Sequence, residues 1–295
     1  MSVLPIEKHM NTPEKIMLWP GAAPFSEDGD GFQPYMESFL LKTQTPAGAV
    51  IVLPGGGYAG KMISYEGRDV CDRFNKEGFH SFMLEYRVAP NRYPAPLVDV
   101  AEAVRTVRRN AAKWKIKPDK IAVLGFSAGG HLAASACVHY GLAESLISDR
   151  KSNAGYHPAG PSLNGITGYL KGNISSRPDA GILCYPVISS EKFGHAGSFK
   201  NLLGENPSDG LMKKMSLELN VHQNAPPVFL WHTANDEAVP VENSLLFAEA
   251  LSLHKIPFEL HVYPDGPHGM GMGGDDPHVA TWVDLCVEWL RKMSF

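Results

Sequence analysis

Short apolar runs of strand length alternate with longer amphipathic segments along most of this 295-residue chain. Strands are predicted where Val, Ile, Leu and Phe concentrate, over residues 48–53, 79–88, 121–124, 180–187, 228–232 and 258–263. Apolar residues at helical spacing predict helices over residues 68–76, 98–113, 243–253 and 279–293. Near-continuous apolar strands that alternate with helices are typical of a mainly parallel sheet buried on both faces. We therefore expect an α/β fold with helices on both faces of a central sheet.

The sequence Gly125-Phe126-Ser127-Ala128-Gly129 lies between the strand predicted over residues 121–124 and a helix-compatible segment over 131–136. A serine with a glycine two residues before it and another two residues after it, between a strand and a helix, is the nucleophile-elbow pattern. The spacing has a steric reason, because side chains at both glycine positions would clash with the strand and the helix. The turn would hold the Ser127 hydroxyl above the sheet, where the amide of Ala128 can bind an oxyanion. Ser127 is therefore the candidate nucleophile.

A serine nucleophile needs an imidazole to take its proton and a carboxylate to orient that imidazole. In an open parallel sheet such groups collect after the carboxyl ends of strands. Asp236 follows the predicted strand 228–232 and is the candidate acid, although alone it could be a turn or helix-capping aspartate. Its neighbour Glu237 is the nearest rival and should point away. Among twelve histidines, His268 is the candidate base, because it follows the predicted strand 258–263 in a glycine-rich loop.

Other polar residues in these regions have simpler explanations. We expect His131 to pack along the helix after Ser127, and His232 to be a buried strand histidine with a hydrogen-bond partner. His278 should be exposed near the start of the last helix. Asp265 and Asp275 lie in turn-rich sequence and need no catalytic role.

Three glycines follow the first of these predicted strands, in Pro54-Gly55-Gly56-Gly57-Tyr58. Glycines let backbone amides approach a substrate oxygen, so the amides of Gly56 and Gly57 are candidates for the rest of an oxyanion hole. Alone, three glycines indicate only a flexible turn, but their place after a strand and before Ser127 favours this role. Tyr58 has two possible roles: its ring narrows the acyl pocket and binds substrate, or it is buried with its hydroxyl satisfied elsewhere.

The chain has no internal repeat and no low-complexity linker, so we expect one domain over residues 1–295. Residues 141–177 interrupt the alternation, because they are polar and rich in Gly, Ser and Asn. Loops of this length in compact domains are usually functional or mobile. Two interpretations of residues 141–177 remain: a flap beside the active site, and a plain surface loop.

Composition excludes several classes of function. Lys and Arg number 27 against 31 Asp and Glu, a formal net charge of −4, and no basic run favours nucleic-acid binding. The four cysteines lack metal-ligand spacing, so we expect reduced thiols and no metal site. No apolar stretch predicts a signal peptide or a membrane span, so we expect a cytoplasmic protein with a small-molecule substrate and no membrane partner. The oligomeric state is open.

Five segments support a family resemblance that covers the chain from about residue 48 to its end. They are Leu53-Pro54-Gly55-Gly56-Gly57-Tyr58, Tyr86-Arg87-Val88-Ala89-Pro90, Gly125-Phe126-Ser127-Ala128-Gly129-Gly130-His131-Leu132-Ala133, His232-Thr233-Ala234-Asn235-Asp236 and Pro267-His268-Gly269. With them the chain resembles α/β-hydrolases of the esterase/lipase type. It is similar to their acetylesterase-like branch, which includes carbohydrate acetylesterases and xylanase-B-like proteins. Related hormone-sensitive-lipase-like enzymes carry His-Gly-Gly-Gly, whereas Pro54 precedes the glycines here, so the histidine that usually braces this loop is missing.

The resemblance implies an α/β-hydrolase fold and two-step acyl transfer through Ser127, His268 and Asp236, with no metal or organic cofactor. We expect a serine carboxylesterase that hydrolyses short-chain esters, above all acetyl esters, of carbohydrates such as acetylated oligosaccharides. An arylformamidase-like amidase or a peptidase on the same fold is the alternative. A non-catalytic ligand-binding protein is a further alternative.

Overall fold

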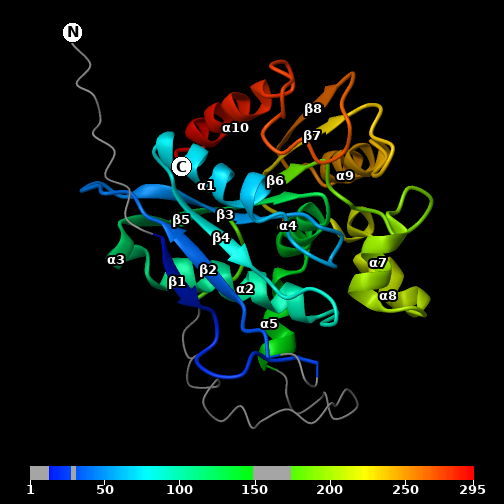
Figure 1. The fold of residues 1–295 in the computed structure, drawn as a ribbon, viewed down its shortest axis with the longest axis horizontal. Coiled ribbons are helices and arrows are strands. Elements are labelled where there is room, and N and C mark those ends of the chain that lie inside the picture. The colour runs from blue at the N-terminus through cyan, green and yellow to red at the C-terminus, as the bar shows by residue number, and fades with distance from the viewer. Residues whose placement is uncertain (1–12, 28–30, 149–173) are drawn as a thin grey trace.

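The computed structural model describes residues 13–27, 31–148 and 174–295. In these ranges eight strands form one sheet in the order β1-β2-β4-β3-β5-β6-β7-β8 (Figure 1). The strands are β1 (Glu14–Met17), β2 (Tyr35–Phe39), β3 (Ala47–Leu53), β4 (His80–Glu85), β5 (Ile116–Phe126), β6 (Ala180–Cys184), β7 (Val228–Thr233) and β8 (Phe258–Tyr263). Strand β2 is antiparallel to β1 and to β4, and the other neighbours are parallel. The sheet is therefore mainly parallel, as predicted.

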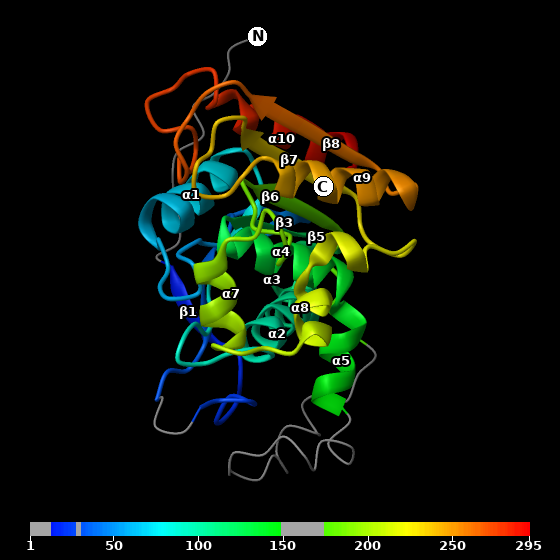
Figure 2. The same cartoon turned by 90° about the vertical axis from the view of Figure 1, so that its right-hand side faces the viewer.

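Helices cover both faces of the sheet (Figures 1 and 2). They are α1 (Asp69–Lys76), α2 (Ala95–Arg109), α3 (Ala111–Trp114), α4 (Ala128–Val138), α5 (Tyr140–Ser148), α7 (Ala196–Leu203), α8 (Asp209–Met215), α9 (Glu242–Leu253) and α10 (Thr281–Lys292), with a π-helical turn η1 (Ser64–Arg68) and a 3₁₀ turn η2 (Leu217–Asn220). Figure 1 shows α1 and α10 on one side of the sheet and α2, α3 and α5 on the other.

Strand β3 shows why the apolar runs are nearly continuous. Ala49, Ile51 and Leu53 point into the core beneath α2 and α4, whereas Val50 and Val52 point into the core beneath α1 and α10. All five residues have no exposed surface. Because both faces are covered, each position of the strand must be apolar, and the twofold alternation of a half-exposed strand is lost.

Two departures from the predicted elements have local causes. The helix predicted over residues 98–113 begins earlier, at Ala95, and is interrupted at Asn110. There the side-chain amide donates to the carbonyl of Thr106 at 2.8 Å, and side chains that bond the backbone in this way compete with helix continuation. The sequence prediction also missed β1 and β2, two short antiparallel strands whose residues carry no long apolar run. Helices α7 and α8 were missed as well.

The segment 141–177 is helical at its start, where α5 packs against α2. At its other end, the amide and the hydroxyl of Ser176 both donate to Glu144 of α5 at 2.8 Å. Helix α4 leads away from Ser127, so α5 begins at the far edge of the sheet from the predicted nucleophile. Residues 149–173 lie outside the described residues, and the flap and the single-domain organisation stay predictions.

The helices of the described ranges include none long and apolar enough to cross a bilayer. All four cysteines are buried and unpaired, which agrees with the prediction of reduced thiols.

A buried ion pair fastens the N-terminal segment to the sheet. The guanidinium of Arg87, two residues after β4, donates to both carboxylate oxygens of Asp99 in α2, at 2.8 and 2.7 Å, and neither side chain is exposed. Arg87 also donates to the carbonyl of Pro24 at 2.6 Å, and Trp19 donates its ring N–H to Asp99 at 3.1 Å. The motif that begins at Tyr86 therefore has a structural role at Arg87.

We predict that Asp99→Ala lowers the free energy of unfolding by about 3–5 kcal/mol, because it leaves the Arg87 charge buried without its carboxylate. Urea unfolding followed by circular dichroism measures this. The control is Glu205→Ala, which removes the partner of Lys200 in a pair with side chains 68% and 61% exposed. That change should cost no more than about 1 kcal/mol. Equal losses in both variants would contradict the structural role of the buried pair.

Candidate active site

Ser127 occupies a strained turn between β5 and α4. Its backbone has φ 53° and ψ −117°, which is left-handed backbone that side chains disfavour. Neighbouring backbone holds the turn: the Ser127 amide donates to Cys184 at 3.0 Å, and the Ser127 carbonyl accepts from Val187 at 3.1 Å. A Cβ atom on Gly125 would lie 2.0 Å from the carbonyl of Gly129, and one on Gly129 would lie 2.1 Å from the carbonyl of Leu53. Both glycines of the motif are therefore sterically required.

The structure brings Ser127, His268 and Asp236 into one chain of hydrogen bonds. Ser127 Oγ lies 2.8 Å from His268 Nε2, and His268 Nδ1 lies 2.7 Å from Asp236 Oδ2. The three residues follow β5, β8 and β7, whose carboxyl ends share one edge of the sheet. The His268 side chain is 23% exposed, whereas that of Asp236 is fully buried. This arrangement lets an imidazole take a proton from the serine while a carboxylate orients the ring.

The Asp236 carboxylate is held by its own loop. Its Oδ1 accepts from the amides of Ala238 and Val239 at 3.0 and 2.9 Å, which leaves Oδ2 for His268. Burial raises the pKa of Asp236, but hydrogen bonds from His232, His268 and the Val239 amide outweigh burial and hold that pKa below its usual range. Asp236 therefore carries a negative charge near neutral pH.

The neighbours of this acid behave largely as predicted. Glu237 is exposed, in contrast to the buried Asp236. His232 is buried and bonded to Ser244 and to the carbonyl of Val239, each at 2.8 Å. It also lies 3.5 Å from Asp236 Oδ2, a contact that sequence reasoning missed. His278 is exposed, as expected.

The glycine loop after β3 presents unused amides beside Ser127. Gly56 and Gly57 have φ of 135° and 64°, values that favour glycine. The carbonyl of Gly56 accepts from the amides of Ala59 and Gly60, at 3.0 and 3.1 Å, which closes the turn. Within the described part of the chain, the amides of Gly56, Gly57 and Ala128 have no acceptor. Free amides held by a rigid turn are what an oxyanion hole requires.

Three polar side chains hold this loop in place, although it lacks the histidine of related hormone-sensitive-lipase-like enzymes. Tyr86 donates to the carbonyl of Pro54 at 2.6 Å, and Asn201 of α7 donates to the carbonyl of Gly57 at 2.9 Å. Glu66 accepts from the amide of Gly55 at 2.8 Å. Of the three, Tyr86 lies in a motif on which the resemblance rests. Glu66 and Asn201 carry no signal in the sequence, because nothing local marks them as buried or near the loop.

Tyr58 takes the second of the two roles left open for it. Its side chain is 2% exposed, and its hydroxyl lies 2.9 Å from Nδ1 of His131, whose Nε2 lies 2.9 Å from the carbonyl of Met215. Burial lowers the pKa of His131 to about 4, so this histidine is neutral and structural, as expected. That the Tyr58 ring also bounds the acyl pocket stays a prediction.

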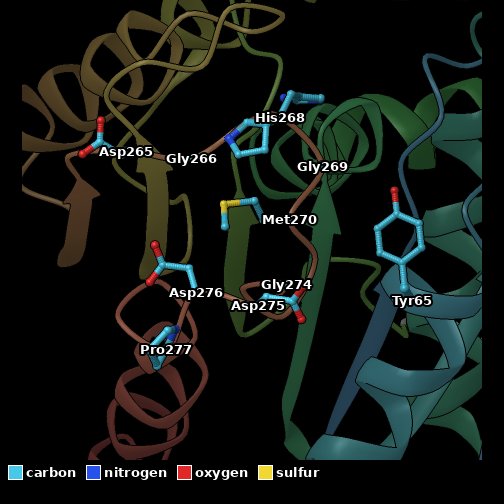
Figure 3. Close-up of a pocket in the computed structure, with 11 residues that line it drawn as sticks. Tyr65, Asp265, Gly266, His268, Gly269, Met270, Gly274, Asp275, Asp276 and Pro277 are labelled. Atoms are coloured by element: carbon cyan, nitrogen blue, oxygen red, sulfur yellow. The ribbon is translucent and has the colours of Figure 1, made fainter.

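A cavity of about 890 Å³ adjoins His268. Its lining combines the ring of Tyr65 with the loop residues Asp265, Gly266, Pro267, His268, Gly269, Met270, Gly274, Asp275, Asp276 and Pro277. Figure 3 shows Tyr65 and Asp265 on opposite sides of the cavity, with His268 between them. Ser127 does not line it, so the cavity extends the site on the histidine side.

Two family models match the chain. The BD-FAE model matches residues 39–159, which include the glycine loop and Ser127. The prolyl oligopeptidase family model matches residues 190–294, which include Asp236 and His268.

Among curated proteins, the chain is 38% identical to the endo-1,4-beta-xylanase B of Butyrivibrio fibrisolvens, over 83% of this chain and 36% of that protein. It is 31% identical to the acetylxylan esterase of Xylanibacter ruminicola, over 91% of this chain and 48% of that protein. The chain thus spans less than half the length of either relative.

Among solved structures, the acetyl ester-xyloside bifunctional hydrolase from Caldicellulosiruptor lactoaceticus is 40% identical with a TM-score of 0.83. The match covers 96% of this chain and 97% of that one. The fold, the geometry of the site and the near-complete match to this neighbour support the same conclusion. The chain belongs to the acetylesterase-like branch of the α/β-hydrolase superfamily.

Proposed function

We propose that this protein is a serine carboxylesterase that removes acetyl groups from carbohydrates. The observation that supports this most strongly is the hydrogen-bonded chain Ser127–His268–Asp236, with distances of 2.8 and 2.7 Å. It lies beside the amides of Gly56, Gly57 and Ala128, which have no acceptor among the residues that the structure describes. His268 removes the proton from Ser127, and Ser127 attacks the ester carbonyl to give an oxyanion that the three amides bind. His268 then protonates the departing alcohol. Water, activated by the same imidazole, hydrolyses the acyl-enzyme.

The names of the relatives support acetyl esters of carbohydrates as substrates, since one is an acetylxylan esterase and another an acetyl ester-xyloside hydrolase. The cavity beside His268 supports a bulky alcohol portion, because the leaving alcohol takes its proton from His268 and therefore departs on that side. A volume of about 890 Å³ is within the range of ligand pockets. The carboxylates of Asp265 and Asp275 in its lining can accept hydrogen bonds from sugar hydroxyls.

A peptidase is the second candidate, because the prolyl oligopeptidase family model matches the part of the chain that holds Asp236 and His268. An arylformamidase-like amidase shares the same chemistry. Comparing kcat/KM for an acetyl ester, a formyl amide and a peptide amide separates the three. The ester should be turned over fastest, and a preference for either amide would replace the esterase proposal.

We predict that Ser127→Ala lowers turnover of p-nitrophenyl acetate by about 10⁴–10⁶-fold, because the nucleophile is lost. Urea unfolding should show that the variant remains folded. A serine-reactive phosphonate should label Ser127 in the parent protein, as read by mass spectrometry of peptides. Label on another serine would overturn the assignment, and a parent without turnover or label would favour a non-catalytic ligand-binding protein.

We predict that Asp236→Asn lowers kcat by about 10⁴-fold, because an amide cannot hold His268 with its Nδ1 protonated. The adjacent Glu237→Gln is the matched control, since Glu237 is exposed, and its steady-state kinetics should equal those of the parent. Activity lost in Glu237→Gln but kept in Asp236→Asn would reverse the choice of acid.

We predict that kcat/KM falls steeply from acetyl to octanoyl esters of p-nitrophenol. The ring of Tyr58, directly after the glycine loop, packs edge-on against those of Tyr86 and His131 at centroid distances of 6.2 and 5.8 Å, and we propose that it limits the length of the acyl pocket. A pocket that clashes with long chains discriminates strongly. Tyr58→Ala should flatten the dependence on chain length, whereas Tyr58→Phe, which keeps the ring, should not. A parent that prefers octanoyl esters would contradict the small-acyl proposal and leave the Ser127 assignment intact.

A further inference from the structure

Glu66 is a carboxylate buried beside the site that the mechanism above does not use. It is 2% exposed, whereas its neighbour Tyr65 is 40% exposed. The π-helical turn η1 directs it inward: the amide of Arg68 donates to the carbonyl of Ile63, five residues earlier, at 2.9 Å. Single π-helical turns of this kind occur frequently at functional sites. A charged group in this position needs an explanation, because burying a carboxylate is costly unless it is well paired.

Glu66 links the two loops on either side of Ser127. Its Oε2 accepts from the amide of Gly55 at 2.8 Å, in the loop that carries the oxyanion amides. Its Oε1 accepts from the hydroxyl of Tyr185 at 2.6 Å, and that hydroxyl accepts from the amide of Gly271 at 2.8 Å, in the loop that carries His268. The Tyr185 ring also meets the His268 ring, with centroids 5.0 Å apart and planes at 70°.

Glu66 and Ser127 flank the same glycine. A Cβ atom built on Gly55 would lie 2.8 Å from Glu66 Oε2 and 3.1 Å from Ser127 Cβ. A side chain at position 55 would therefore push the carboxylate and the nucleophile apart. The first glycine of the loop is required for this close packing and Gly57 for its backbone angle. Gly56 is required for both reasons, since a Cβ atom there would lie 2.3 Å from the carbonyl oxygen of Gly60.

The hydrogen-bond pattern specifies a carboxylate at position 66. The Gly271 amide donates to the Tyr185 oxygen, so the Tyr185 proton is donated to Glu66. The Gly55 amide donates to the other oxygen, so both oxygens of Glu66 are acceptors. A glutamine has one acceptor and one donor at these positions. With its NH₂ group toward Gly55 it faces the amide donor, and with its NH₂ group toward Tyr185 it makes that hydroxyl an acceptor, so that the Tyr185 proton loses its acceptor at position 66. An isosteric amide therefore either breaks the link to Gly55 or reverses the direction of the link to Tyr185 and removes its charged acceptor.

We propose that Glu66 is a positioning residue for acyl transfer. Through its hydrogen bonds to Gly55 and Tyr185 it fixes the oxyanion loop and the His268 loop relative to each other. Its negative charge also stabilises the imidazolium that forms at His268. This inference rests on the proposed esterase function. Asp236 binds the Nδ1 side of the ring directly, whereas Glu66 acts through the Tyr185 ring and the backbone.

The electrostatics agree with this geometry. Burial raises the pKa of Glu66, while hydrogen bonds from Tyr185 and Gly55 and the positive charge of His268 each lower it. The attraction between Glu66 and a charged His268 acts in both directions. A charge that develops at His268 in the transition state therefore meets a carboxylate already in place, which is the preorganised arrangement that favours charge development.

Glu66→Gln is the test, and Asp69→Asn, an exposed acid three residues later, is the matched control. We expect Glu66→Gln to lower kcat for p-nitrophenyl acetate by about 10–100-fold with little change in KM, since small displacements of reacting groups cost about this much. The rate at which a phosphonate labels Ser127 should fall in parallel. Asp69→Asn should match the parent in both measurements.

Measuring the stability of Glu66→Gln distinguishes a positioning role of Glu66 in catalysis from a role in folding. Because burial raises the pKa of Glu66 above 4.5, the folded parent loses stability as the pH rises through that raised pKa. The other titratable groups that interact with Glu66 are Tyr65, Tyr86, Tyr185, Cys184 and His268. The parent and the Glu66→Gln variant both contain these groups, so their titration does not distinguish the two. The unfolding free energy of Glu66→Gln relative to the parent should therefore increase with pH above about 4.5, while its activity stays low.

Tyr185→Phe, which removes the linking hydroxyl, should also lower kcat, and the double variant should be little worse than the poorer single one. Unchanged kcat and labelling rate in Glu66→Gln would overturn this inference alone. So would a loss of activity that follows a loss of stability, or additive effects of the two changes. Failure to label Ser127 in the parent would overturn the proposed function and this inference together.

Discussion

The left-handed backbone of Ser127 is the constraint around which this site is arranged. A φ of 53° at a residue with a side chain is unfavourable, and such strain persists only where the surroundings impose it. Here close backbone packing imposes it, because there is no room for a Cβ atom at positions 125 and 129, both occupied by glycine. The end of β6 and the segment after it also form hydrogen bonds with the amide and the carbonyl of Ser127. The turn in return places Ser127 Oγ at the carboxyl edge of the sheet.

That edge explains how residues from five separate loops meet. Strands β3, β5, β6, β7 and β8 are parallel and adjacent, so the segments after them emerge side by side in the order glycine loop, Ser127, Tyr185, Asp236 and His268. His268 thereby meets two carboxylates of different kinds. Asp236 bonds the ring nitrogen directly, and its pKa is held low by hydrogen bonds; Glu66 is linked through Tyr185, and its pKa is raised by burial.

Much of this could be predicted from the sequence. The apolar runs of β3 to β8 and the helix that follows Ser127 are local patterns, and the order Ser127, Asp236, His268 follows from the chemistry and from the position of each residue after a strand. Strands β1 and β2 were missed because short antiparallel strands at the sheet edge need little apolar sequence. The break at Asn110 was missed because periodicity continues across it, while its cause is a single side-chain bond.

The sequence alone therefore determined the fold class, the turn at Ser127 and the identity of the acid and base candidates, because each leaves a local mark in residue type and spacing. The tertiary structure alone decided the support of the site. Glu66 lies 11 residues from Gly55 and 119 from Tyr185 in the chain, and their hydrogen bonds leave no periodicity or motif. The same holds for Tyr58 and His131, which are 73 residues apart. Whether a polar side chain is exposed or buried against a distant partner depends on packing between segments far apart in the chain, and that information is not local.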